Sequence, residues 1–234
     1  MKRANSNSGV SRGLKISQKR GQKTYDTLIK TAFRLLKNRV LSSISVAELT
    51  RAAGYSVGAF YARFKSKDEF LDALVDYHLK SRRASHASLF STYAGEELID
   101  ELIADLVTYI LKNRGFWQTC LMCSVHDPEF WEPMRELGYE ASNDIIGCLS
   151  KDLGREFTEQ EKLNVRFGFQ ITFGTINNTI INHPGPIEIK DSLFIEKLTC
   201  AFKLVSGYYF LLNNREEKQP LKTGLQERPA TGFN

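Results

Sequence analysis

The stretch ISVAELTRAAGYSVGAFYARFKSKDE, residues 44–69, decides the fold prediction for this chain. Ser45 followed three residues later by Glu48 is the pattern of a capping box, in which each side chain bonds an N–H group at the start of a helix. Gly54 supplies the residue that most readily takes the left-handed conformation at a helix end. The sequence therefore predicts a helix of about two turns between Ser45 and Gly54.

A second short helix is expected directly after this one. Ser56 is a good N-cap residue, and Phe60 and Phe64 follow at the four-residue spacing of a buried helical stripe. Two short helices joined by a glycine-containing turn predict a helix-turn-helix, whose second helix can enter the major groove of DNA. The alternative is an ordinary pair of packed helices.

The outward face of the second helix favours the DNA-binding interpretation. Gly58 and Ala62 point away from the buried phenylalanines at 100° per residue, and the flanking Ala59 is also small. A solvated face usually carries long charged side chains, whereas this one is nearly uncharged. Such a face can approach another surface closely.

Over residues 44–71 the sequence resembles the TetR family of bacterial transcriptional regulators. The resemblance rests on the capped first helix, the glycine turn, the aromatic second helix and the run that follows it, namely Val46 to Leu49, Ala52, Ala53, Gly54, Ser56, Gly58, Phe60, Tyr61 and Phe64 to Glu69. It implies an all-α fold, with an N-terminal helix-turn-helix domain and a C-terminal helical domain for ligand binding and dimerisation.

The candidate DNA-binding residues combine this resemblance with side-chain chemistry. Arg63 carries the paired donors that suit guanine O6 and N7, and the small side chains could touch thymine methyl groups. Tyr61, Lys65 and Lys67 match phosphate-contacting positions of the family. The full candidate set is Lys19, Arg20, Arg51, Ser56, Val57, Gly58, Ala59, Tyr61, Ala62, Arg63, Lys65 and Lys67.

Charge is divided unevenly along the chain. Residues 1–83 hold 18 Lys and Arg against 6 Asp and Glu, whereas the remainder holds 14 against 21. A basic domain neutralises phosphates and releases condensed counterions, so this asymmetry favours nucleic-acid binding. The alternative is a basic disordered leader on a neutral domain, but residues 1–20 supply half of the excess and the rest lies on expected helices.

The expected organisation is that of a helical protein of 234 residues. We expect a disordered basic leader over residues 1–20, a DNA-binding domain over 21–85, a ligand-binding and dimerisation domain over 86–213, and a disordered tail over 214–234. Neither a signal peptide nor an apolar run of membrane-spanning length is apparent, so a cytoplasmic protein without membrane association is expected.

Aromatic residues concentrate between residues 115 and 140, and ligand pockets are mostly apolar with a few polar groups. For any single residue, ordinary core packing is the competing interpretation, but the family resemblance implies a small-molecule effector in this domain. The candidate lining residues are Phe116, Trp117, Cys120, Leu121, Trp131, Met134, Gln170 and Phe173.

Cys120 and Cys123 form a C-x-x-C pattern close to His126. The pattern is compatible with a redox dithiol or half of a zinc site, but no second Cys/His pair accompanies it and a thioredoxin-like motif needs a βαβ setting. Cysteines packed on a helix are the preferred interpretation. Neither a metal nor a cofactor is expected.

The last two expected helices are apolar on more than one side. One begins at the Thr158 cap and runs to about residue 181, and the other follows Asp191. They resemble the two helices with which TetR-family members dimerise, against the alternative of a monomer whose other helices cover both sides. The candidate interface residues are Phe194, Leu198, Phe202, Val205 and Tyr209.

The functional prediction is a homodimeric, ligand-responsive transcriptional regulator. It is expected to act as a repressor that leaves a palindromic operator in double-stranded DNA when a small, largely apolar effector binds. An activator of the same fold is the alternative. A thiol-based redox sensor or an all-helical enzyme is less favoured, because the four histidines assemble no set of nucleophile, base and orienting group.

Overall fold

The computed structural model describes the backbone of residues 8–209 and the side chains of residues 21–209. Within this range the chain is helical and contains no strand. The elements are α1 (Ser8–Leu35), η1 (Leu41–Ser43), α2 (Val46–Ala53), α3 (Val57–Tyr61), α4 (Lys67–Thr92), α5 (Gly95–Lys112), α6 (Arg114–His126), η2 (Pro128–Trp131), α7 (Glu132–Leu153), α8 (Glu159–Asn182) and α9 (Ser192–Val205). The all-α fold expected from the sequence is confirmed.

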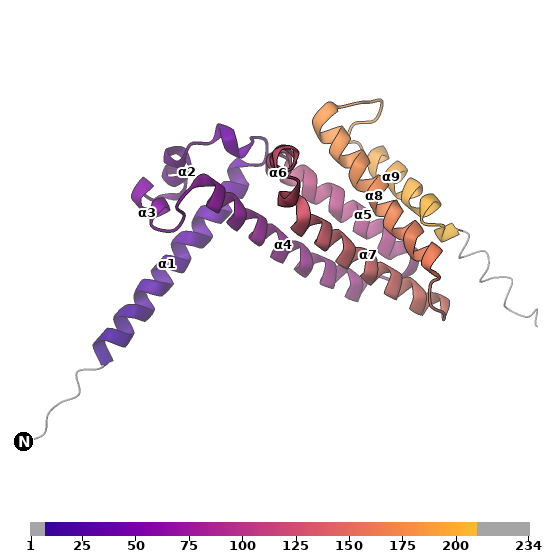
Figure 1. The fold of residues 1–234 in the computed structure, drawn as a ribbon, viewed down its shortest axis with the longest axis horizontal. Coiled ribbons are helices and arrows are strands. Elements are labelled where there is room, and N and C mark those ends of the chain that lie inside the picture. Colours follow the sequence, from indigo (N-terminus) through magenta and orange to yellow (C-terminus); the bar gives the residue numbers. More distant parts are fainter. Residues whose placement is uncertain (1–7, 210–234) are drawn as a thin grey trace, which may run out of the picture.

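The helices form an elongated molecule with two unlike ends (Figure 1). Helices α1, α2 and α3 make one end, from which the N-terminal half of α1 projects away from the body. Helix α4 leads from this end into a bundle with α5 and α7, and α8 and α9 form the opposite end. No helix among the described residues is long and apolar enough to cross a membrane.

Three serines begin the helices of the DNA-binding region. The side chains of Ser45, Ser56 and Ser66 each accept a hydrogen bond from a backbone N–H three residues later, at the starts of α2, α3 and α4. Gly54 ends α2 with φ 74°, the left-handed conformation that favours glycine. The predicted helix-turn-helix is therefore present.

An aromatic cluster holds these short helices together. The rings of Phe60, Phe64 and Phe70 lie with centroids 4.8–5.3 Å apart, and the tilted ring of Tyr25 on α1 lies 5.5 Å from Phe64. All three phenylalanines are buried. Tilted and edge-on ring contacts of this kind add stability beyond the area that they bury.

Helix α6 joins the DNA-binding end to the rest of the molecule. Its Phe116 and Cys120, together with Met134 and Leu137 of α7, belong to the same buried cluster as the cores of α1 to α4. A second cluster fills the space between α5, α7, α8 and α9. The two functional regions consequently share packed side chains instead of being joined by a free linker.

Three predicted boundaries need correction. Residues 8–20 are helical and belong to α1; they contain no proline, the residue that most strongly breaks a helix. Helix α4 passes through the expected junction at residue 85 and ends at Thr92, since Leu89 and Phe90 pack against the second cluster. Helix α3 ends at Tyr61, so Ala62 and Arg63 lie beyond it. Residues 1–7 and the expected tail lie outside the described residues.

The predicted dimer contacts of α9 also need correction. Phe194, Leu198 and Phe202 are buried within this chain, where they face α5 and α8. Phe202 lies close to Gly168 of α8, where an added Cβ would stand 3.1 Å from the Phe202 ring. Val205 is half-buried and Tyr209 is exposed. Three of the five predicted interface residues are therefore apolar because they pack inside the protomer.

Candidate functional site

The outer face of α3 is open to solvent. Val57 and Tyr61 are 41% and 55% exposed, and Gly58 and Ala62 are also exposed, whereas Ala59 is half-buried. A Cβ at Gly58 would find only the Ser56 hydroxyl within 4 Å, at 3.8 Å. This short helix thus presents small side chains and backbone at the surface, as a close approach to a major groove requires.

Arg63 was predicted to reach a guanine from the flank of α3, but in the structure its side chain turns to α1. Its Nε donates to the backbone oxygen of Gly21 on α1 at 3.2 Å, and one terminal nitrogen donates to the Ala62 oxygen. A Cβ at Gly21 would lie 2.9 Å from the guanidinium. Because Arg63 follows the end of α3 and bonds α1, its guanidinium holds two helices together instead of projecting from the recognition face.

Basic side chains flank the open face. Arg51 at the end of α2 and Lys65 before α4 are exposed, while Lys67 in the first turn of α4 is half-buried. Partial burial lowers the pKa of Lys67, and nearby Asp68 opposes that effect. The side chains of Lys19 and Arg20 lie outside the described part, although their backbone belongs to α1. The arrangement can neutralise phosphates on both sides of α3.

A cavity of about 870 Å³ lies among helices α4 to α8. Helix α4 contributes His78, Arg82 and His86, and α8 lines the cavity from Gln160 to Asn177. Helices α5, α6 and α7, together with η2, supply the remaining walls. This volume and its mixed apolar and polar lining are those of a small-molecule site.

One end of the cavity is aromatic. The Trp117 ring stands 5.4 Å from Trp131 in an edge-on contact and 6.4 Å from Phe173 in a nearly parallel one. The indole N–H of Trp117 donates to Asn177 Oδ1 at 2.9 Å. This bond fixes the orientation of the Trp117 ring on the side of the cavity nearest α6.

Polar groups from α4 and α5 line another part of the wall. His78 Nδ1 and the Tyr109 hydroxyl are 2.8 Å apart, and Arg82 pairs with Asp105 at 2.5 Å while its guanidinium lies over the Tyr109 ring. Burial, aided by Arg82, lowers the pKa of His78 to about 3 and that of His86 to about 4. Both histidines are therefore neutral near pH 7.

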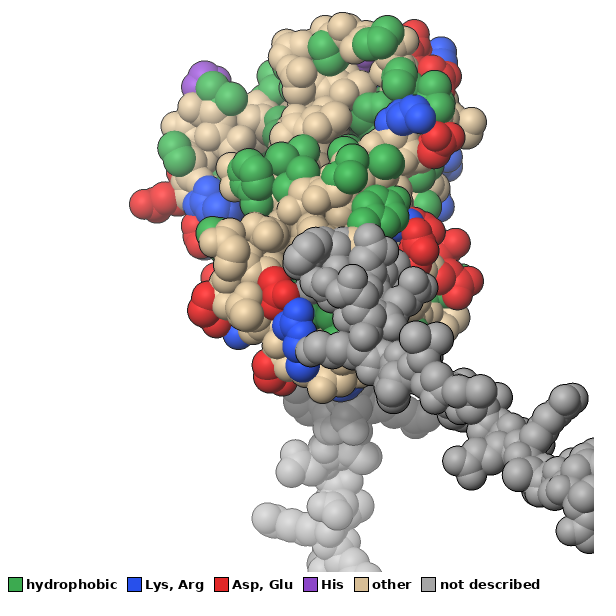
Figure 2. Space-filling view, turned by 90° about the vertical axis from the view of Figure 1, so that its right-hand side faces the viewer, with side chains coloured by type: hydrophobic (Ala, Val, Ile, Leu, Met, Phe, Trp, Pro, Cys, Tyr) green, Lys and Arg blue, Asp and Glu red, His purple; other side chains and the backbone are tan. Residues whose placement is uncertain are grey.

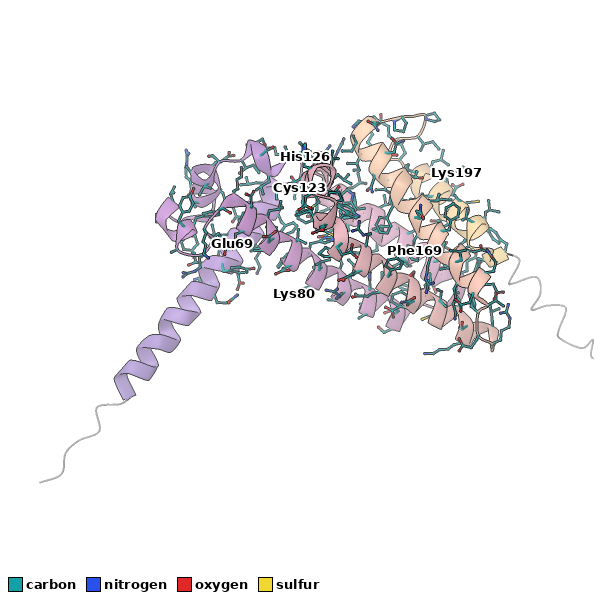
Figure 3. The ribbon with its side chains drawn as sticks, in the orientation of Figure 1. Glu69, Lys80, Cys123, His126, Phe169 and Lys197 are labelled. Atoms are coloured by element: carbon teal, nitrogen blue, oxygen red, sulfur yellow. The ribbon has the colours of Figure 1, made fainter. Side chains whose placement is uncertain are left out.

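The cysteine pattern of α6 forms no metal cluster. Cys123 and His126 lie near the end of α6 (Figure 3), and the described residues contain no group of three or more side chains suited to holding a metal ion. Cys120 is buried, and burial raises the pKa of the thiols of both Cys120 and Cys123. Raised thiol pKa values oppose redox reactivity, so packing is the role that these cysteines fit.

Comparison with known proteins agrees with the geometry of the helix-turn-helix. Residues 28–74 match the sequence description "Bacterial regulatory proteins, tetR family". Residues 28–74 therefore carry the DNA-binding domain of the TetR family. The members of this family are transcriptional regulators and not enzymes. The chain is also 45% identical over 53 residues to the uncharacterised HTH-type transcriptional regulator YwcC of Bacillus subtilis (strain 168), a match that spans 23% of this chain and 24% of that protein.

Solved structures of TetR-family regulators share the whole fold. A regulator from Mesorhizobium loti aligns over 82% of this chain and 98% of its own length, with 14% sequence identity and a TM-score of 0.63. A regulator from Streptomyces coelicolor aligns over 84% of this chain and 92% of its own length, with 15% identity and a TM-score of 0.57. The structure of RolR in complex with resorcinol aligns over 87% of this chain and 97% of its own length, with 21% identity and a TM-score of 0.55. At these identities the likeness concerns the fold.

Five of the residues proposed for an effector pocket border this cavity, namely Trp117, Trp131, Met134, Gln170 and Phe173. Phe116 and Cys120 are instead buried in the core shared with the DNA-binding helices, and Leu121 packs against the second core, so these three are corrections. The sequence prediction missed the four-residue spacing of His78, Arg82 and His86, which places all three on one face of α4.

Helices α8 and α9 leave an apolar surface uncovered. Leu163, Phe167 and Ile181 of α8 and Leu193 and Leu204 of α9 are each 43–64% exposed. Figure 2, which views the molecule from the α8–α9 end, shows hydrophobic side chains gathered in a band with charged side chains mainly around it. An exposed apolar surface of this kind is a candidate contact site.

Proposed function

We propose that this TetR-family protein is a homodimeric repressor that binds an operator in double-stranded DNA and leaves it when a small effector occupies the cavity. The observation that carries the proposal is that helix α6 packs against the DNA-binding helices and also lines the cavity. Its Phe116 is packed in the core of the DNA-binding helices, and the adjacent Trp117 lines the cavity.

Helix α6 is also fixed to the end of α1. The backbone N–H of Phe116 donates to the Leu36 oxygen at 3.2 Å, and a Cβ at Gly115 would lie 2.1 Å from the Arg39 oxygen. At such close contact a shift of Trp117 cannot be absorbed between α6 and α1. An effector that favours a displaced α6 therefore favours a displaced DNA-binding region, which is the differential binding that release requires.

The apolar surface of α8 and α9 supports the homodimer. Residues such as Phe167 and Leu204 face solvent in one chain, and a two-fold axis through this surface would cover both copies with the same patch. Two copies of α3 would then face successive major grooves, about 34–36 Å apart. A change in their spacing would weaken both half-sites together. DNA binding in the cytoplasm is the role that fits this arrangement.

The resorcinol complex of RolR supports the ligand response by likeness of fold, because that regulator has a small phenolic molecule as its ligand. The cavity of the present chain has room for a molecule at least as large. The chemical class of the effector must be inferred from the side chains that line the cavity.

In vitro transcription tests repression directly. The template should carry a duplex selected from random DNA by the full chain, placed across a promoter, with a scrambled duplex as control. We expect added protein to lower transcription from the first template only. An increase from that template would contradict repression and favour activation by the same fold.

A further inference from the structure

The charged side chains that line the cavity are all of one sign. Arg82, Arg135 and Arg166 contribute to its walls, whereas no Asp or Glu is among its described lining residues. His78 and His86 are neutral and add no charge. The cavity therefore offers cations to a ligand and no compensating carboxylate at its surface.

Two of the three arginines are already paired. Arg82 forms its ion pair with Asp105 of α5, and Arg135 pairs with Glu132 in the preceding turn of α7. Their charges are thus balanced by neighbours behind or beside the cavity wall. Neither guanidinium needs a ligand for charge neutralisation.

Arg166 is different from the other two. One of its terminal nitrogens donates to Asn143 Oδ1 at 3.2 Å, but its Nε is buried and has no hydrogen-bond partner. No carboxylate of the described residues forms an ion pair with it. Removing a guanidinium donor from water without a partner is unfavourable, and a bound carboxylate would satisfy it with a charge-assisted bond.

The unpaired arginine and the aromatic end are well separated. Arg166 and Asn177 both belong to α8 and are 11 positions apart, which corresponds to about 16 Å along a helix. Asn177 holds the Trp117 indole, so that distance approximates the length of cavity between the cation and the aromatic rings. Phe169 and Phe173 of α8 line the cavity between these two positions.

We propose that the effector is an elongated apolar carboxylate. Its carboxylate pairs with Arg166, and its hydrocarbon body extends along α8 towards Trp117, Trp131 and Phe173. This inference rests on the proposed function, because it names the chemical class of ligand for the same cavity. It assigns to Arg166 the recognition of charge and to the aromatic residues the recognition of the apolar body.

Tryptophan emission offers a direct test, because the chain has two tryptophans and both line the cavity. Dodecanoate and the uncharged dodecan-1-ol should be titrated separately, below their aggregation limits, into the full chain. The same titrations should be made with Arg166→Gln and with the matched control Arg135→Gln, whose arginine is already paired with Glu132.

We expect dodecanoate to change the emission and to bind the wild type at least about tenfold more tightly than the alcohol. Arg166→Gln should remove this preference and leave alcohol binding unchanged, while Arg135→Gln should preserve it. Equal affinities for acid and alcohol in the wild type, an equal loss of both in Arg166→Gln, or no binding of either would overturn the inference.

Operator affinity, measured on the same preparations without a probe, separates this result from the proposed function. A wild type that binds its selected operator but does not prefer the acid refutes the carboxylate class alone. A wild type that selects no operator refutes the proposed function, whatever the titrations give.

Discussion

The hydroxyl oxygen of Thr119, on α6, accepts a hydrogen bond from the backbone N–H of Leu41 at 2.9 Å. Both residues are buried, and the same hydroxyl donates to the Gly115 oxygen at 2.7 Å. This bond joins α6, whose Trp117 lines the cavity, to the segment that leads into the helix-turn-helix. It is therefore a structural link between the two regions that the proposed repressor mechanism must couple.

Thr119→Val should weaken this link with little change of shape. The buried N–H of Leu41 would lose its acceptor, which costs about 1–3 kcal/mol in the free energy of unfolding. Urea unfolding measures that loss. Thr92→Val is the control, since the Thr92 hydroxyl bonds the Ser88 oxygen at an exposed helix end and should matter little. Equal stability of the two variants would contradict the importance of the link.

Gly115→Ala tests the close contact between α6 and the end of α1. The added methyl group would lie 2.1 Å from the Arg39 backbone oxygen, so the two segments must separate. We expect a loss of about 1–3 kcal/mol in the free energy of unfolding. Gly147→Ala, within α7 and with nothing within 4 Å, should instead add up to about 1 kcal/mol of stability. Thermal or urea unfolding of both variants compares them, and a stabilised Gly115→Ala would refute the contact.

The buried His78 and the half-buried His86 predict a pH dependence of stability. Burial lowers the pKa of His78 to about 3 and that of His86 to about 4, whereas a histidine in the unfolded chain titrates near 6.5. Below pH 6.5 the unfolded chain therefore takes up protons that the folded chain does not. As the pH falls below 6.5, the free energy of unfolding should therefore decrease by up to about 1.4 kcal/mol per pH unit for each histidine. The decrease should stop when the pH reaches the pKa of that histidine in the folded chain.

Urea unfolding between pH 7.5 and 4.5 measures this slope. His78→Gln should flatten it by the contribution of one histidine, because glutamine does not titrate. His126→Gln, at the exposed end of α6, serves as the control and should leave the slope unchanged. If the His78→Gln profile runs parallel to that of the wild type, the neutral buried state of His78 is incorrect.

The uncovered surface of α8 and α9 predicts a specific disruption of the dimer. Leu204→Glu places a charge where the side chain is 64% exposed in one chain and would be buried in a dimer. Sedimentation should show monomers that retain their helical content. Val125→Glu changes a residue that is 77% exposed on α6 and should leave the dimer intact. A Leu204→Glu protein that remains dimeric would remove this surface from the interface.

The sequence predicted features that are set by local interactions. Ser45, Ser56 and Ser66 identified three helix starts because a cap needs only a side chain and a nearby N–H. It did not predict features that depend on distant segments. Arg63 bonds Gly21, 42 residues away, and that partner could not be deduced from periodicity on α3.

The same limit explains the errors in the ligand-binding region. Phe202 and Trp117 are both large apolar residues on helices, yet one packs against Gly168 and the other borders a cavity. Periodicity shows which side of a helix is buried but not whether its neighbour leaves a space. Arg166 was missed for a related reason, since Asn143, to which it donates a hydrogen bond, belongs to another helix.

Selection of binding sites from random duplex DNA tests the central claim most directly. The full chain should enrich one sequence composed of two half-sites related by two-fold symmetry, with centres one helical turn or a multiple of it apart. Gly58→Leu should lose affinity for that duplex while keeping its helical content, because its side chain would project from the open face of α3. Failure to enrich a symmetric site, or full binding by Gly58→Leu, would contradict an operator-binding dimer that inserts α3 into the major groove.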